Sequence, residues 1–81
     1  MQVFYKETAV KQVKRIPKTE VKKILRKLDN LGKNPYAGKP LKGELKGFYS
    51  LKSWPFRVIY RIEKKNVIIY SVAHRQGVYK S

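Results

Sequence analysis

The chain has 81 residues, of which 42% are hydrophobic, and it carries 20 Lys and Arg against 5 Asp and Glu, for a net charge of +15. This length predicts one domain over residues 1–81 with a single small core. The absence of cysteine excludes disulfides and thiolate metal sites, and the apolar runs fall far short of the ~20 residues that a membrane-spanning helix needs. We expect a soluble, cytoplasmic protein that does not reside in a membrane.

The excess of positive charge predicts a polyanionic partner. Five acids cannot pair with twenty bases, and the remaining self-repulsion opposes a compact state. Nucleic acid is the first candidate, an acidic protein the second and an anionic membrane surface the third. A lysine-rich surface without a specific partner is the alternative.

The first part of the chain predicts one strand followed by two helices. Residues 2–5 are rich in strand formers, and apolar residues then recur at helical spacing, with Thr8 as the expected N-cap. Pro17 separates this first helix from a second over residues 17–33, which has a clear apolar stripe. We expect Gly32 to end the second helix in a left-handed conformation. So short a connection predicts an antiparallel helical hairpin.

The second part of the chain predicts a three-stranded antiparallel meander. Residues 36–43 contain three turn formers and predict a loop. Three stretches with strand patterns follow at 47–53, 56–63 and 67–72, and they are joined by connections short enough for hairpins. The last stretch is apolar on both faces, which is typical of a central strand.

Alternation along these strands separates cations from apolar side chains. Lys52, Arg57 and Arg61 fall on the face opposite to that of the large apolar residues. The helices should cover the apolar face and leave the cationic one open. The expected fold is therefore α+β, with an N-terminal strand, a two-helix hairpin and an antiparallel three-stranded meander packed on the helices.

The order of these elements, the LKG sequence at 41–43, FRVIY at 56–60 and HRxxVY at 74–79 together resemble one family. The chain is similar to the RelE/ParE superfamily of type II toxin–antitoxin toxins, on the side of the RelE-like mRNA interferases. This resemblance implies a toxin that enters the ribosomal A site, cleaves mRNA there and inhibits translation, with neither metal nor cofactor. It also implies inhibition by a cognate acidic antitoxin. We expect the toxin to be a monomer when free.

The resemblance also implies roles for five residues as a catalytic set. Lys52 matches a base, while Arg57 and Arg75 match arginines that stabilise the transition state. Tyr79 matches a tyrosine that stacks on or orients the substrate base. His74 matches a histidine with an acid–base role, and which of Lys52 and His74 is the base stays open.

Three further residues are expected to bind RNA, namely Lys46, Ser50 and Arg61. The sequence also departs from the family pattern in three places. Ser50 replaces a second cation, which weakens the expected grip on phosphate, and the turn at 54–55 is Trp-Pro instead of a glycine–acid pair. The chain stops two residues after Tyr79, so a C-terminal helix is not expected.

The residues themselves favour cleavage chemistry based on cations. Attack by a ribose 2′-OH requires its deprotonation, stabilisation of the phosphorane charge and protonation of the leaving 5′-oxygen. One His and five acids supply this poorly and form no metal ligand set. Arginines, however, can fork onto phosphate oxygens, and a lysine crowded by cations can act as a base.

Two other functions stay open. A ParE-like toxin would inhibit DNA gyrase through protein contacts, without cleavage, and would not need a phosphate-facing cluster. A basic module that binds RNA or the ribosome without cutting would lose affinity to a similar degree whichever cation is removed. Individually, Lys52 and Arg61 can also be read as ordinary solvent-facing strand residues.

Overall fold

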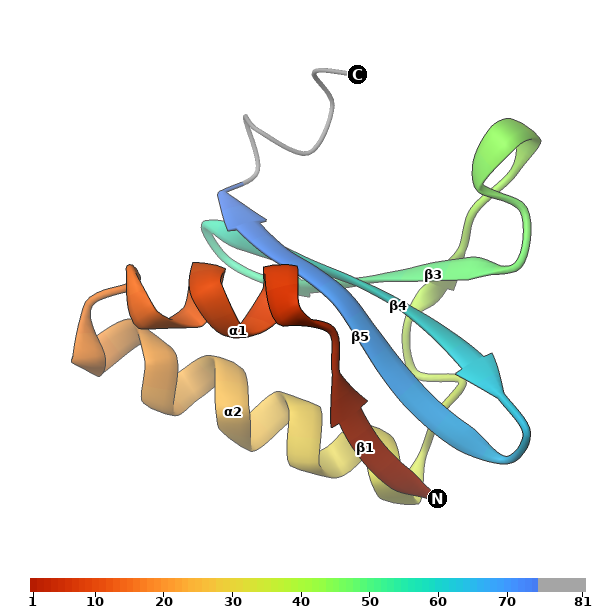
Figure 1. The fold of residues 1–81 in the computed structure, drawn as a ribbon, viewed down its shortest axis with the longest axis horizontal. Helices are drawn as coiled ribbons and strands as arrows, with labels where there is room; N and C mark the ends of the chain where they lie inside the picture. Colours follow the sequence, from red (N-terminus) through yellow and green to blue (C-terminus); the bar gives the residue numbers. More distant parts are fainter. Residues whose placement is uncertain (75–81) are drawn as a thin grey trace.

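A computed structural model describes residues 1–74, which form one sheet with a layer of two helices on one side (Figure 1). The elements in chain order are β1 (Gln2–Tyr5), α1 (Glu7–Lys14), α2 (Lys18–Lys33), β2 (Lys39–Pro40), the short 3-10 helix η1 (Gly43–Leu45), β3 (Phe48–Ser53), β4 (Phe56–Glu63) and β5 (Asn66–His74). This arrangement confirms the expected α+β fold.

The sheet has five strands in the order β1-β5-β4-β3-β2. The central strands β3, β4 and β5 form the predicted antiparallel meander. Two further pairings complete the sheet, because β1 runs parallel to β5 at one edge and β2 runs antiparallel to β3 at the other. The expectation of a plain loop over 36–43 is thus wrong at Lys39–Pro40, where an edge position tolerates proline.

The two helices run antiparallel to each other against the same face of the sheet (Figure 1). Thr8 is not the N-cap of α1, since the helix already begins at Glu7 and Lys6 takes the cap position without a side-chain hydrogen bond. Within residues 1–74, no helix is both long enough and apolar enough to span a membrane.

Gly32 allows close packing instead of ending α2 in a left-handed conformation. The helix continues through Gly32 to Lys33, and Asn34 is its C-cap. A Cβ at position 32 would lie 2.8 Å from the carbonyl oxygen of Met1. The Met1 ammonium group also donates a hydrogen bond to the Gly32 carbonyl oxygen at 2.8 Å. The glycine therefore lets the start of the chain lie against the end of α2.

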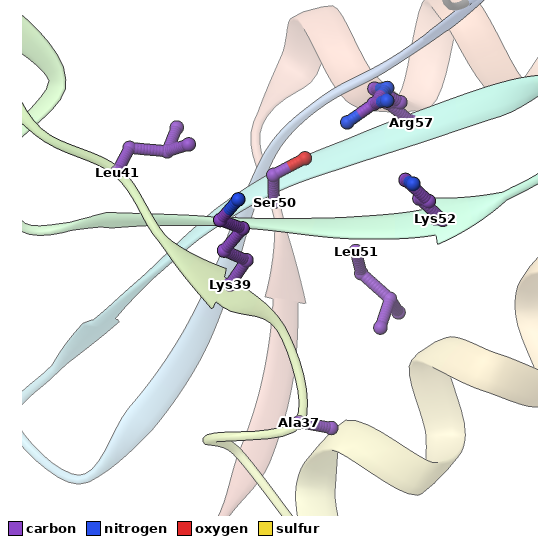
Figure 2. Close-up of a pocket in the computed structure, with 7 residues that line it drawn as sticks. All are labelled: Ala37, Lys39, Leu41, Ser50, Leu51, Lys52 and Arg57. Carbon is purple, nitrogen blue, oxygen red and sulfur yellow. The ribbon is translucent and has the colours of Figure 1, made fainter.

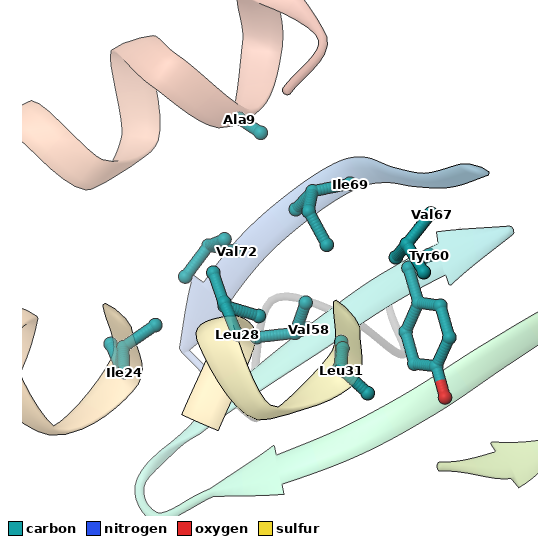
Figure 3. Close-up of a cluster of buried hydrophobic side chains, with 9 residues drawn as sticks. All are labelled: Ala9, Ile24, Leu28, Leu31, Val58, Tyr60, Val67, Ile69 and Val72. Atoms are coloured by element: carbon teal, nitrogen blue, oxygen red, sulfur yellow. The ribbon is translucent and has the colours of Figure 1, made fainter. Parts of the chain in front are cut away.

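The core lies between the helices and the sheet (Figure 3). Its buried members are Ala9, Ile24, Leu28, Leu31, Val58, Tyr60, Val67, Ile69 and Val72. Each of the two helices and of the strands β4 and β5 contributes to this cluster, which explains how a small domain obtains one continuous apolar interior. The even positions of β4 face the helices, as the alternation predicts.

A bulge in β5 changes the alternation along the last strand. Between the register pairs Ile59–Ser71 and Tyr60–Ile69, β5 holds one extra residue, Tyr70. Such an insertion lets the residues on both sides of it keep their apolar side chains on the core. Val72 therefore joins Val67 and Ile69 in the core, although uninterrupted alternation would put it on the other face.

Candidate functional site

The face of the sheet opposite the helices, termed here the open face, carries the predicted cations. Lys52 pairs directly with Arg57 across β3 and β4, and directly paired residues of an antiparallel ladder project from the same face with Cβ atoms about 4.5–5.5 Å apart. Arg61 lies four residues further along β4. Lys52 and Arg61 are exposed and Arg57 is half-buried. The prediction that these three cations share the face without helices is confirmed.

A pocket of about 500 Å³ lies beside this pair at the edge of β3, and its lining includes the core-facing Leu51 as well as side chains of the open face (Figure 2). Its lining consists of Ala37, Lys39, Leu41, Ser50, Leu51, Lys52 and Arg57. We call it the cation pocket, because three of these side chains carry positive charge. Its volume falls within the range of small-ligand sites, and its mixed lining suits a group that is anionic at one end and apolar at the other.

Lys39 is the member of the pocket that the sequence did not identify. It pairs with Ser50 across β2 and β3, and Figure 2 shows the two side chains on neighbouring strands at the pocket. A lysine between two turn formers carries no periodic signal, because a two-residue strand is too short to show alternation. Only the pairing of β2 with β3 reveals that Lys39 belongs with Lys52 and Arg57.

Ser50 contributes a buried polar atom to the pocket. Ser50 is 8% exposed, and within the described part of the chain its hydroxyl oxygen has no hydrogen-bond partner. A buried hydroxyl without a partner is costly, so it usually has one supplied from elsewhere. Its position between Lys39 and Lys52 makes a bound anion a suitable partner.

Tyr60 holds the segment that carries Lys39 against the sheet. Its hydroxyl donates a hydrogen bond to the Pro35 carbonyl oxygen at 2.8 Å and accepts one from the Gly38 N–H at 2.9 Å. A Cβ at position 38 would lie 2.6 Å from this hydroxyl, which only glycine avoids. The Tyr60 ring also stacks on Tyr49, with centroids 5.3 Å apart, and burial raises the pKa of Tyr60 above its usual 10.0. We call this arrangement the Tyr60 latch.

The helical layer also supports β3 at the position of Lys52. The ammonium group of Lys27, on α2, donates a hydrogen bond to the Lys52 carbonyl oxygen at 2.8 Å. This contact fixes the backbone, whereas the Lys52 side chain projects to the opposite face. The pocket is therefore positioned from the helices below it and from the latch beside it.

Two of the remaining predicted site residues, His74 and Lys46, lie away from the cation pocket. His74 pairs with Phe56, and their rings meet edge to face with centroids 5.7 Å apart. Since Phe56 packs against the core, the register places His74 on the helical side, opposite to Arg57. Lys46 is exposed in the turn before β3 and does not line the pocket. Arg75 and Tyr79 fall outside the described residues.

Two further observations concern possible metal ligands and an exposed aromatic residue within residues 1–74. No three His, Asp or Glu side chains of this segment gather in a way that would hold a metal ion. Trp54, in the turn between β3 and β4, is 66% exposed.

Comparison with known proteins identifies the family. A family model described as the ParE toxin of the type II toxin–antitoxin system parDE matches residues 3–79. Toxin RelG of Mycobacterium tuberculosis is 40% identical over 45 residues, which are 53% of this chain and 52% of RelG. The alignment thus spans about half the length of this curated relative.

Solved structures share this fold over most of the chain. The RelBE2 toxin–antitoxin complex of Mycobacterium tuberculosis contains a chain that superposes with a TM-score of 0.84 at 29% identity, covering 91% of this chain and 96% of that one. A YoeB/ParE toxin from Agrobacterium tumefaciens superposes with a TM-score of 0.80 at 21% identity, covering 91% of this chain and 98% of that one. Since the family model covers nearly the whole sequence, the chain belongs to the RelE/ParE superfamily of type II toxin–antitoxin toxins.

Proposed function

We propose that this toxin is a ribosome-dependent mRNA endonuclease that cuts in the A site and inhibits translation. The observation that carries the proposal is the cation pocket, in which Lys39, Lys52 and Arg57 surround the buried hydroxyl of Ser50. Several cations and one free hydroxyl in a pocket are what a phosphodiester requires. A surface that only bound another protein would have no need of this group.

Within the pocket, each side chain has a distinct part in the proposed reaction. The guanidinium group of Arg57 forks onto the non-bridging oxygens of the scissile phosphate, and the ammonium group of Lys39 and the hydroxyl of Ser50 bind the same group from the side of β2. Lys52 accepts the proton of the ribose 2′-OH, whose oxygen attacks the phosphorus and expels the 5′-oxygen. The products are a 2′,3′-cyclic phosphate and a 5′-hydroxyl.

Protonation of the leaving 5′-oxygen requires a second group. The register places His74 on the other side of the sheet, so the described residues do not bring it together with Lys52. The roles of His74, Arg75 and Tyr79 therefore rest on the family resemblance alone. The ribosome orders the mRNA in its A site. A pocket that mainly binds phosphate should therefore cut ribosome-bound mRNA better than free RNA, in which the 2′-OH and the phosphate are not held in a reactive geometry.

The partners follow from charge and from similarity. A net charge of +15 suits both ribosomal RNA and an acidic protein. The RelBE2 structure of Mycobacterium tuberculosis, which superposes with a TM-score of 0.84, is a toxin–antitoxin complex. We propose that a cognate acidic antitoxin binds this chain and inhibits it.

Cleavage during in vitro translation tests the proposal. Primer extension on the translated mRNA should map ribosome-dependent, codon-spaced cuts for the wild type, and Arg57→Ala should lower their rate by about 100-fold or more. Arg26→Ala is the matched control, because it removes one exposed arginine from α2 and should cut like the wild type. Equal cutting by both variants would exclude the pocket as the reaction site.

Gyrase inhibition is the second candidate, because the matching family model is described as the ParE toxin. A gyrase inhibitor would block DNA supercoiling in the absence of ribosomes and would leave mRNA intact. Arg57→Ala would then have no larger effect than Arg26→Ala, unless Arg57 itself contacted gyrase. A module that binds RNA without cutting would also leave mRNA intact, but it would leave supercoiling unaffected as well.

A further inference from the structure

A second cluster on the open face combines aromatic rings with cations. The rings of Phe48 and Tyr70 meet edge to face with centroids 4.9 Å apart. The guanidinium carbon of Arg61 lies 5.5 Å from the Phe48 centroid, and the ammonium nitrogen of Lys6 lies 5.3 Å from the Tyr70 centroid. Three of these residues come from β3, β5 and β4, and Lys6 directly follows β1. We call the four residues the aromatic cluster.

The orientation of the Tyr70 ring is fixed before any ligand binds. Its hydroxyl donates a hydrogen bond to a carboxylate oxygen of Glu63 at 2.5 Å. This hydrogen bond is the main cause that raises the pKa of Tyr70 above its usual 10.0. A preset ring loses little conformational freedom on binding.

The sheet register relates the aromatic cluster to the cation pocket. Phe48 pairs with Arg61, and Lys52 pairs with Arg57 four residues further along the same two strands. At about 3.3 Å per residue the two pairs are roughly 13 Å apart on one face. Phe4 extends the cluster toward the sheet edge, because it pairs with Ile68 in the row of Arg61 and is 47% exposed.

We infer that the aromatic cluster is a second RNA-binding site, at which bases of the mRNA next to the scissile phosphate stack on aromatic rings or on the Arg61 guanidinium group. The inference rests on the proposed function for its substrate. Sheets that present aromatic side chains bind single-stranded RNA in this way, because every base has a stacking face. The Arg61 guanidinium group can supply both stacking and charge, and the Lys6 ammonium group supplies charge. A separation of roughly 13 Å suits a single strand that runs from the pocket across the sheet.

RNA binding by single-residue variants of the full chain tests the inference. The probe is a short fluorescent single-stranded RNA, titrated at several salt concentrations. Tyr70→Leu and Phe48→Leu should each weaken binding by about 5- to 100-fold, because each removes a ring. Their salt slopes should equal that of the wild type, since stacking releases no counterions, whereas Arg61→Ala should lower the slope by about 1.

Two matched variants separate stacking from loss of structure. Tyr70→Phe keeps the ring but removes the hydroxyl that binds Glu63, so it should lose only the advantage of the preset orientation and should bind RNA more tightly than Tyr70→Leu. Tyr36→Leu removes an exposed ring that lies outside the cluster and packs against Tyr49, and it should have no effect. If Phe48→Leu does not fold, Phe4→Leu, at an exposed position, replaces it in the test.

The outcomes distinguish this inference from the proposed function. Unchanged RNA affinity in Tyr70→Leu and in Phe48→Leu or its replacement would overturn the inference, even if the wild type cuts mRNA. Unchanged RNA affinity together with weaker binding of the acidic antitoxin would identify the cluster as a protein-docking surface instead. Ring-dependent RNA binding by a toxin that leaves translated mRNA intact would support the inference and refute the nuclease proposal.

Discussion

At the scale of single residues, the pairing of Lys39 with Ser50 puts a positive charge where β3 itself carries only a hydroxyl. The two positions share a face of the sheet and line the same pocket. A lysine at either position would bring an ammonium group to the same part of the pocket. We infer that Lys39, on the neighbouring strand, supplies the cation that the family resemblance places at position 50.

Exchanging these two residues tests this interpretation. Lys39→Ser should lower the rate of mRNA cleavage by about 10-fold or more, the loss expected for one hydrogen bond to a charged group. Adding Ser50→Lys to the same chain should restore most of that rate. Lys42→Ser removes a nearby exposed lysine that does not line the pocket and should have little effect. A double variant as slow as Lys39→Ser would contradict the interpretation.

The Tyr60 latch predicts both a loss of stability and a change in its pH dependence. Tyr60→Phe leaves the Gly38 N–H and the Pro35 carbonyl without their partner, so the free energy of unfolding should fall by about 1–3 kcal/mol. Tyr49→Phe is the control, because no hydrogen bond of its hydroxyl is seen in the described residues. Urea unfolding at pH 7 measures both, and an equal loss in the two variants would argue against the latch.

The sign of the pH dependence follows from the raised pKa of Tyr60. Above about pH 10 the unfolded chain loses the proton while the folded protein still holds it, so the wild type loses stability as pH rises through this range. Tyr60→Phe lacks this contribution. The difference in the free energy of unfolding between wild type and Tyr60→Phe should therefore shrink between pH 9 and pH 11, and a constant difference would contradict the prediction.

At the scale of elements, the turn between β4 and β5 carries backbone strain. Lys64 and Lys65 both have positive φ, at 48° and 65°, as a two-residue hairpin turn requires, although glycine is preferred there. Lys65→Gly should raise the free energy of unfolding by about 1 kcal/mol and the melting temperature by about 4–8 °C. Lys65→Ala removes the same charge but keeps the strain, so its melting temperature should not rise. Equal gains in both variants would assign the effect to charge.

Elements with several turns or alternations could be predicted, and shorter features could not. The helices and the strands β3, β4 and β5 repeat their patterns often enough to be recognised, and the shared face of Lys52 and Arg57 follows from the same alternation. A two-residue strand shows no pattern, so the sequence reveals neither β2 nor the place of Lys39 in the pocket. The position of His74 opposite Phe56 depends on the register of β5, which contains a bulge at Tyr70. The role of Gly32 cannot be predicted locally, because close packing with Met1 leaves no signal in the neighbouring sequence.

At the scale of the whole molecule, positive charge is distributed over two surfaces with different consequences. The outer face of α2 carries the exposed Lys22 and Lys23, and the open face carries the cations of the cation pocket. Charge far from the site increases the rate of encounter with a polyanion, whereas charge in the site stabilises the reacting phosphate.

Neutralising the outer face of α2 should therefore slow binding without changing the cuts. Lys22→Gln/Lys23→Gln should lower the apparent affinity for ribosomes at low salt, and the cut positions and the saturated cleavage rate should equal those of the wild type. Arg57→Ala should lower the saturated rate itself. A titration of toxin in the translation assay separates the two effects, and a lower saturated rate in the α2 variant would contradict the assignment.

The central claim is that this toxin cuts mRNA on the ribosome, and parallel assays with one preparation of the wild type test it directly. Purified toxin is added to an in vitro translation reaction, to the same mRNA without ribosomes, and to a gyrase supercoiling reaction. The cation pocket predicts codon-spaced cuts in the first reaction, weak cutting in the second and normal supercoiling in the third. Intact mRNA in the translation reaction together with blocked supercoiling would contradict the claim.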